Sequence, residues 1–142
     1  MKELIEITIS IEASFHMGGE NFSPIKAQKI TGLVFSKIQE LGSLETKGPN
    51  KGKPRTLGSA VLYAPNNVDL DLNCYAGLEW IVDNLKENIK MLIECGAEEM
   101  YLSIGVFYKY QCNMAFEPYL LNKISDLNVS FWISCYEDNE EE

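Results

Sequence analysis

The sequence predicts a single α+β domain, a mainly antiparallel sheet of about four to six strands with helices packed on one face. Residues 4–15 alternate apolar and polar side chains, whereas a parallel strand covered on both faces gives a continuous apolar run. Residues 75–95 repeat apolar side chains at helical spacing. Two further alternating segments, 101–110 and 129–136, complete the pattern of one dry and one solvated sheet face.

The first strand and the helix after it are predicted from residues 4–42. The dry face of the strand carries Ile5, Ile7, Ile9, Ile11, Ala13 and Phe15. A turn at Gly18 and Gly19 follows, and His16 is placed in that turn. Ser23 before Pro24 supplies an N-cap hydroxyl and a first helical residue with fixed φ. The helix then ends either at Gly32 or, if the apolar spacing continues through Phe35, at Gly42.

The glycine- and proline-rich residues 42–65 predict a loop flanked by short strands around Leu44 and over 57–63. The tip of this loop concentrates basic side chains, namely Lys47, Lys51, Lys53 and Arg55. An anion contact is one interpretation of this cluster. A solvated hairpin loop is the other, because no glycine-rich phosphate-binding motif accompanies the charges.

Residues 75–95 form the longest predicted helix, with Asn73 as its cap and Gly96 at its end, and we expect it to cover the sheet face that carries Ile5 to Ile11. The strand over 101–110 turns Leu102, Ile104 and Val106 to one side and Tyr101 and Phe107 to the other. A short helix begins at Pro118. The last strand, 129–136, places Phe131, Ile133 and Cys135 on one face and Trp132 and Tyr136 on the other.

Residues 22–33 and 116–127 align without a gap. Both contain a Phe-x-Pro start, a Lys-Ile pair and a final leucine, and each segment follows a predicted strand and turn. Two such units suggest a ferredoxin-like pseudo-repeat. True duplication and two independent solutions to starting a helix with proline both account for the identities.

Composition and charge exclude several classes of protein. The folded domain is expected over 1–136, followed by an acidic, disordered tail over 137–142 that holds five of the acids. A net charge of −9 argues against binding to nucleic acid or to an anionic membrane. Neither a membrane span nor a secretion signal is predicted, which favours a cytoplasmic protein.

The spacing of the four cysteines is not that of a metal site, so no metal, cofactor or disulfide is predicted for Cys74, Cys95, Cys112 and Cys135. Cys135 is expected to pack as a small apolar residue.

Two functional hypotheses remain, because none of the common nucleotide-binding or hydrolase motifs occurs and His16 is the only histidine. The first is a non-enzymatic protein-binding domain that uses aromatic side chains on an open sheet face, namely Trp132, Tyr136, Tyr101 and Phe107. Burial of this face by a helix or in a homodimer is the competing interpretation. The second hypothesis is a small-molecule or anion site, with or without enzymatic activity, built from His16, Lys51, Lys53 and Arg55.

The order of elements also resembles a known family. An alternating first strand, a proline-started helix, the segment Lys51-Gly52-Lys53-Pro54-Arg55, a long amphipathic helix and a last strand ending in Ile133-Ser134-Cys135-Tyr136 are similar to the bacterial domain-of-unknown-function family number 4279. A strand tryptophan typical of that family is replaced here by the segment Ala60-Val61-Leu62-Tyr63. The resemblance implies a small cytoplasmic protein that acts as an immunity protein and neutralises a cognate toxin. The acidic charge suits a basic toxin domain as partner.

Overall fold

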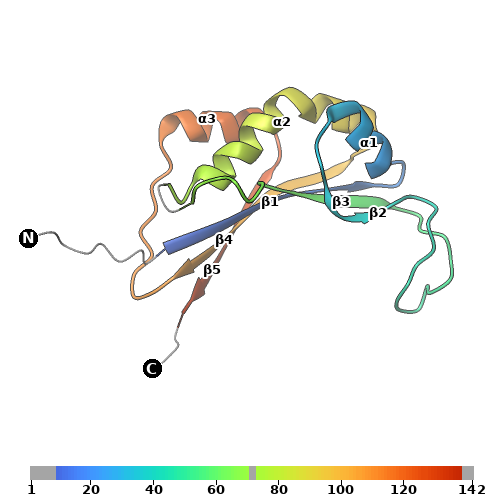
Figure 1. Cartoon of the computed structure of the whole chain (residues 1–142), viewed down its shortest axis with the longest axis horizontal. Coiled ribbons are helices and arrows are strands. Elements are labelled where there is room, and N and C mark those ends of the chain that lie inside the picture. Colours follow the sequence, from blue (N-terminus) through green and yellow to red (C-terminus); the bar gives the residue numbers. More distant parts are fainter. Residues whose placement is uncertain (1–8, 71–72, 139–142) are drawn as a thin grey trace, which may run out of the picture.

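The computed structural model describes residues 9–70 and 73–138, which form five strands and three helices (Figure 1). Their bounds are β1 Ile9–Gly19, α1 Pro24–Thr31, β2 Ser36–Gln39, β3 Gly58–Tyr63, α2 Ala76–Glu94, β4 Glu99–Tyr108, α3 Pro118–Asp126 and β5 Ser130–Glu137. The five strands form one sheet in the order β2-β3-β1-β4-β5. No helix in these described ranges has the length and apolar character needed to cross a membrane.

The predicted α+β class is confirmed. Three of the four strand pairs are antiparallel, and only β4 and β5 run parallel. The three helices of the described residues lie on one side of the sheet, and no helix of this part of the chain lies on the opposite side (Figure 1). The architecture therefore leaves one sheet face open.

Strand β1 occupies the centre of the sheet and provides much of the core. Ile11, Phe15 and Met17 are buried on the helix side, as the alternation predicted for the first two, while Ile5 and Ile7 lie outside the described residues. The strand does not turn after Phe15 but continues to Gly19, so the predicted turn at Gly18 and Gly19 is wrong. A Cβ on Gly19 would lie 2.5 Å from the backbone oxygen of Gly96. Glycine is therefore needed for a close backbone approach.

Helix α1 begins and ends as its local sequence directs. The Ser23 hydroxyl accepts from the Lys26 N–H at 3.2 Å, and the helix stops at Gly32, which has a φ of 76°. The alternative prediction, in which this helix extends to Gly42, is wrong, because strand β2 begins at Ser36. Gln28 Oε1 accepts from the Phe35 N–H at 2.7 Å and holds the chain where it leaves the helix.

Helix α2 covers the helix side of β1 and supplies five fully buried side chains to the core: Leu78, Ile81, Val82, Leu85 and Leu92. It ends in a Schellman motif, in which the Ala97 N–H donates to Leu92 O at 3.0 Å and the Gly96 N–H donates to Ile93 O at 2.9 Å. Asn73 accepts from the Tyr75 N–H in the turn before the helix, so the N-cap position itself is Tyr75. The predicted helix bounds are confirmed to within one residue at each end.

The two aligned segments form equivalent units with different neighbours. Pro24 starts α1 between β1 and β2, and Pro118 starts α3 between β4 and β5. The strands of each unit are parallel, since β1 and β2 both pair antiparallel with β3. In the first unit β3 lies between the two strands, whereas β5 pairs directly with β4. Both units place their last strand, β2 or β5, at a border of the sheet.

Candidate functional site

Aromatic side chains gather on the open side of β4 and β5. Alternation places Tyr101, Phe107, Trp132 and Tyr136 on the side away from the helices, together with the His16 imidazole on β1. The exposed fractions are 38% for Tyr101, 39% for Phe107, 60% for Trp132 and 53% for Tyr136. We call these five side chains the aromatic face. It unites the four residues that the sequence predicted for partner binding.

Ring contacts join the members of the aromatic face in two groups. The His16 and Tyr101 rings stack with centroids 4.5 Å apart at 4°, because the two residues are direct cross-strand partners. Trp132 lies on the next strand, 5.9 Å from the Tyr101 ring. Phe107 and Tyr136 are also direct partners and stack at 5.2 Å. The face is thus held by its own contacts before any ligand arrives.

Gly105 provides space within the aromatic face. It lies between Ser103 and Phe107 on β4, and a Cβ at this position would meet Phe107 Cε2 at 3.4 Å and Tyr136 Cε2 at 3.8 Å. The two rings thus lie close to the bare glycine backbone. A glycine inside an alternating strand often marks such a close approach, so the sequence carried a signal that the prediction did not use.

His16 lies in β1 and not in a turn. Its Nε2 is 3.0 Å from Ser14 Oγ in a hydrogen bond. Burial and the nearby Lys37 ammonium hold the pKa of His16 below its ordinary value, because both disfavour the imidazolium. The ring that stacks on Tyr101 is therefore neutral at pH 7.

A polar hollow of about 780 Å³ adjoins the aromatic face on the side of β3. Side chains from four strands and from the loop between β2 and β3 line it: His16 on β1, Lys37 and Gln39 on β2, Ser59 on β3, Glu45 in the loop, Glu99 on β4 and Glu98 just before it. Acidic side chains outnumber basic ones around this hollow. Its charge therefore suits a cationic group better than the anion of the second hypothesis.

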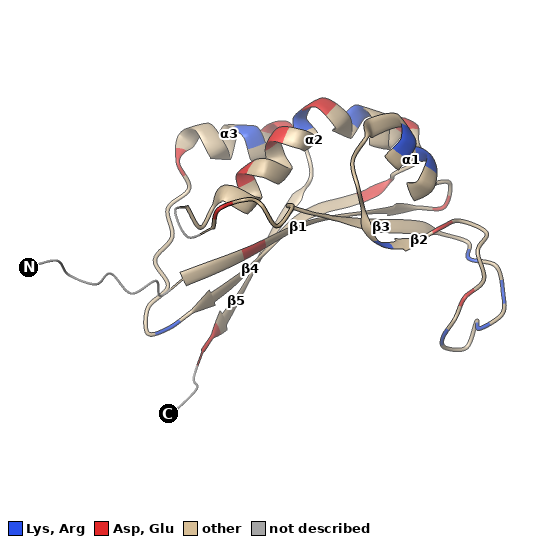
Figure 2. Cartoon of the chain, in the orientation of Figure 1, with Lys and Arg blue, Asp and Glu red and all other residues tan. Residues whose placement is uncertain are grey.

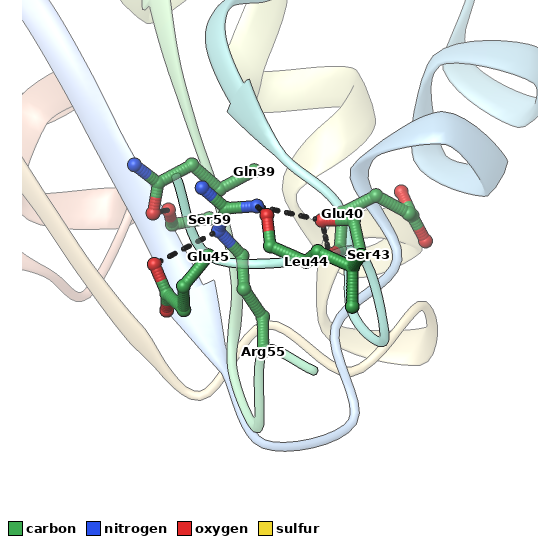
Figure 3. A network of polar contacts seen from close by, with 7 residues as sticks. All are labelled: Gln39, Glu40, Ser43, Leu44, Glu45, Arg55 and Ser59. Carbon is green, nitrogen blue, oxygen red and sulfur yellow. Dashed lines mark hydrogen bonds and ion pairs between the residues drawn. The ribbon is translucent and has the colours of Figure 1, made fainter. Parts of the chain in front are cut away.

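The basic residues of the long loop do not converge on this hollow. Figure 3 shows the Arg55 guanidinium directed at its own loop, where Nη1 donates to Ser43 Oγ at 2.9 Å and to Leu44 O at 2.7 Å. Arg55 Nε lies 3.6 Å from Glu45 Oε2, and the side chain is only 11% exposed. Lys51 and Lys53 are exposed on the loop and do not line the hollow. Of the four predicted anion-binding residues, only His16 reaches it.

Sequence reasoning missed Lys37 and Tyr63, which lie at the β2 side of the open face. Lys37 Nζ is 5.5 Å from the centre of the Tyr63 ring. Lys37 has a φ of 50°, which only a few per cent of non-glycine residues adopt. A strand of four residues shows too little alternation to be recognised, so no sequence signal identified Lys37.

The four cysteines are unpaired thiols, and no group of three or more metal-ligating side chains occurs among residues 9–70 and 73–138. Cys135 is exposed, so its expected burial is wrong. Alternation placed it on the helix side of β5, but every residue of β5 except Phe131 is exposed.

The open face offers aromatic surface, one imidazole that is hydrogen-bonded to the Ser14 hydroxyl, and flanking carboxylates. Comparison with protein-family models, with curated proteins and with solved structures finds no match of this chain to any of them.

Proposed function

We propose that this chain is a non-enzymatic protein-binding domain whose aromatic face binds a basic protein. The observation that carries the proposal is the set of exposed, mutually contacting rings on a sheet face without helices. Tyrosine and tryptophan are enriched at protein interfaces, because they bury large areas at a small cost in side-chain entropy. Rings that already stack on one another lose less freedom on binding than free side chains.

Charge supports a basic partner. Glu12 and Glu99 are exposed on β1 and β4, and alternation puts both on the same open side as the rings. Figure 2 shows few charged residues along β4 and β5, and the whole chain carries a net charge of −9. An apolar centre with acidic neighbours attracts a positively charged surface and raises the rate of association.

The finer form of the proposal is an immunity protein that neutralises a bacterial toxin by covering its active site. The resemblance of the element order to the bacterial family number 4279 supports this form. The adjacent gene then encodes the partner. The alternative, an anion site in the polar hollow, has less support because Arg55 is bound within its own loop and carboxylates line the hollow.

The test measures binding of the purified product of the adjacent gene by isothermal titration calorimetry. We expect Trp132→Ala to weaken binding by about 2 kcal/mol or more, roughly thirtyfold, because a central interface aromatic is removed. Tyr110→Ala is the matched control, since Tyr110 is 86% exposed but lies in the turn after β4. An adjacent gene that encodes a metabolic enzyme, with no binding to this chain, would contradict the proposal.

A further inference from the structure

The outer edge of β5 has no strand beside it in the described part of the chain. β5 is the last strand in the sheet order and pairs with β4 alone. The Asp138 N–H donates to Tyr108 O at 2.8 Å. Because peptide groups alternate along a strand, the even-numbered residues of β5 point theirs at β4 and the odd-numbered ones point theirs outward. Phe131, Ile133 and Cys135 therefore offer free donors and acceptors along this edge.

β5 lacks the features that usually prevent edge strands from pairing. Residues 130–136 contain no proline, lysine or glycine, and their register with β4 is continuous. Apolar side chains are exposed on both faces of the strand, with Ile133 at 47% on the helix side and Trp132 at 60% on the open side. A long, regular and apolar edge of this kind is a template for another strand.

We propose that two copies of this chain pair through β5 as antiparallel strands related by a twofold axis at Ser134. A twofold axis normal to the sheet keeps both open faces on the same side, so even-numbered residues must lie opposite even-numbered residues. Centring the axis on Ser134 places Trp132 of each copy opposite Tyr136 of the other. These pairs lie at non-hydrogen-bonded positions, where cross-strand side chains approach most closely.

The same register satisfies the backbone and separates the charges. Ile133 of one copy lies opposite Cys135 of the other, and the outward peptide groups of both residues form the hydrogen-bonded positions. Glu137 lies opposite Phe131, so the acidic ends of the two strands are at opposite ends of the interface. The β5 edge is therefore complementary to a second copy of itself, which identifies the occupant.

The assembly closes at two copies. The other border of the sheet, β2, is only four residues long, shifts its register against β3 and carries Lys37 with a left-handed φ. Each of these features discourages strand addition. Pairing through β5 also joins the two aromatic faces into one surface, although the dimer does not depend on the proposed basic partner.

Sedimentation equilibrium of the full chain tests the dimer. The wild type should reach twice the 16.1 kDa of one chain as its concentration rises. Ser134→Lys should return the protein to a monomer with an unchanged circular dichroism spectrum, because it puts two ammonium groups opposite each other on the axis. Ser10→Lys adds the same charge to the open side of β1 and should remain dimeric. A wild type that stays monomeric up to its solubility limit, or a folded S134K dimer, would overturn the proposal.

Disulfide trapping tests the register. In a Cys135→Ser background, Ser134→Cys should form a dimer on exposure to oxidised glutathione, because residues on the axis face their own copies at disulfide distance. Ser130→Cys, in the same background, lies opposite residue 138 in this register and should not cross-link. A cross-link at position 130 without one at 134 would exclude pairing about Ser134.

Salt separates this inference from the proposed function. Two copies of an acidic chain repel each other, so added salt should strengthen the dimer. Binding of a basic partner depends on attraction, and added salt should weaken it. A wild type that is monomeric at every salt concentration overturns the dimer and leaves the partner-binding proposal standing.

Discussion

The two borders of the sheet are built in opposite ways. β5 is eight residues long, keeps a continuous register with β4 and exposes Trp132 and Tyr136. β2 is four residues long, has an irregular register and is followed by a loop that Arg55 holds together. One border is protected against further pairing, and the other is regular and apolar. This difference indicates where the molecule interacts and where it does not.

The surface of the open face also differs between the β4 and β5 side and the β3 side. On the β4 and β5 side the exposed surface consists mainly of rings in mutual contact. On the β3 side, Val61 pairs with His16 on the open side of the sheet but is buried, with only 8% of it exposed. Carboxylates line the hollow beside it. The ring side provides contact area, whereas the loop side provides charge. We expect substitutions on the two sides to affect different properties.

Truncation of core side chains should give the largest losses of stability. The loss should be equal for a residue on β3 and a residue on β4. Leu62 on β3 and Leu102 on β4 are fully buried against the helices. Each change to alanine should lower the free energy of unfolding by about 2–5 kcal/mol in urea titrations. Tyr63→Ala and Trp132→Ala remove exposed rings and should cost much less. A Trp132→Ala loss as large as that of Leu102→Ala would show that the aromatic face is an internal layer and not a free surface.

The next largest effect should be on partner affinity, which substitutions on the β4 and β5 side should lower and substitutions on the loop side should not. Trp132→Ala should reduce affinity by about 2 kcal/mol or more. His16→Ala removes a smaller ring at the margin of the aromatic face and should cost less, and Lys53→Ala should leave the affinity unchanged within a few tenths of a kcal/mol. Surface plasmon resonance with the product of the adjacent gene measures all three variants. The reverse pattern, with thermal stabilisation by phosphate that Lys53→Ala removes, would support the anion site instead.

Removal of the Arg55 side chain should destabilise the loop between β2 and β3 and leave the β4 and β5 side of the sheet unchanged. Arg55→Ala deletes the bonds to Ser43 Oγ and Leu44 O and should cost about 1–3 kcal/mol of stability. Hydrogen exchange should speed up at the Gly42, Glu45 and Arg55 amides, which pair across this loop, and should stay slow in β4. Lys53→Ala is the control, since Lys53 is exposed. Equal exchange changes in β5 would mean that the two borders are coupled.

The smallest effect should come from His16, which lies where the two sides meet. Its pKa is lowered in the folded state by burial and by Lys37, so the unfolded chain binds the extra proton more readily. The contribution of His16 to stability is therefore complete above the unfolded pKa of about 6.5 and decreases as the pH falls toward the lowered folded pKa. Chemical denaturation of the wild type and of His16→Gln at both ends of this window should show the smaller pH dependence in the variant. An NMR titration of the imidazole with a pKa above 6.5 would contradict the sign.

Much of the fold was readable because its signals are local. The alternation of Ile9, Ile11 and Phe15, the Ser23-Pro24 helix start and the Gly96 stop each act over a few residues, and all three are confirmed. The four members of the aromatic face on β4 and β5 were also readable, since side-chain parity along these strands follows directly from the sequence. Alternation assigns residues to one face of a strand without knowledge of the partner strands.

The parts that were not readable depend on contacts distant in sequence. The continuation of β1 through His16 follows from pairing with β3 and β4, and Cys135 is exposed although its direct partner Val106 is buried. Arg55 was counted as a free basic residue, but loop geometry directs its guanidinium inward. The type of a residue specifies which polar groups its side chain carries. Only the tertiary arrangement specifies whether these groups are bonded within the molecule or are free to bind a partner.

The central position of β1 has a consequence for how the chain is made. β1 is synthesised before the other strands of this sheet, yet Ile9 pairs with Tyr108 and Gly18 pairs with Glu99. Of its two partner strands in the described residues, only β3 is available to β1 until β4 has been synthesised. Such distant pairings close slowly, on the order of milliseconds to seconds for sheets rich in non-local contacts. A nascent chain that stalls before β4 exposes this strand, and we expect it to be a substrate for chaperones at that stage.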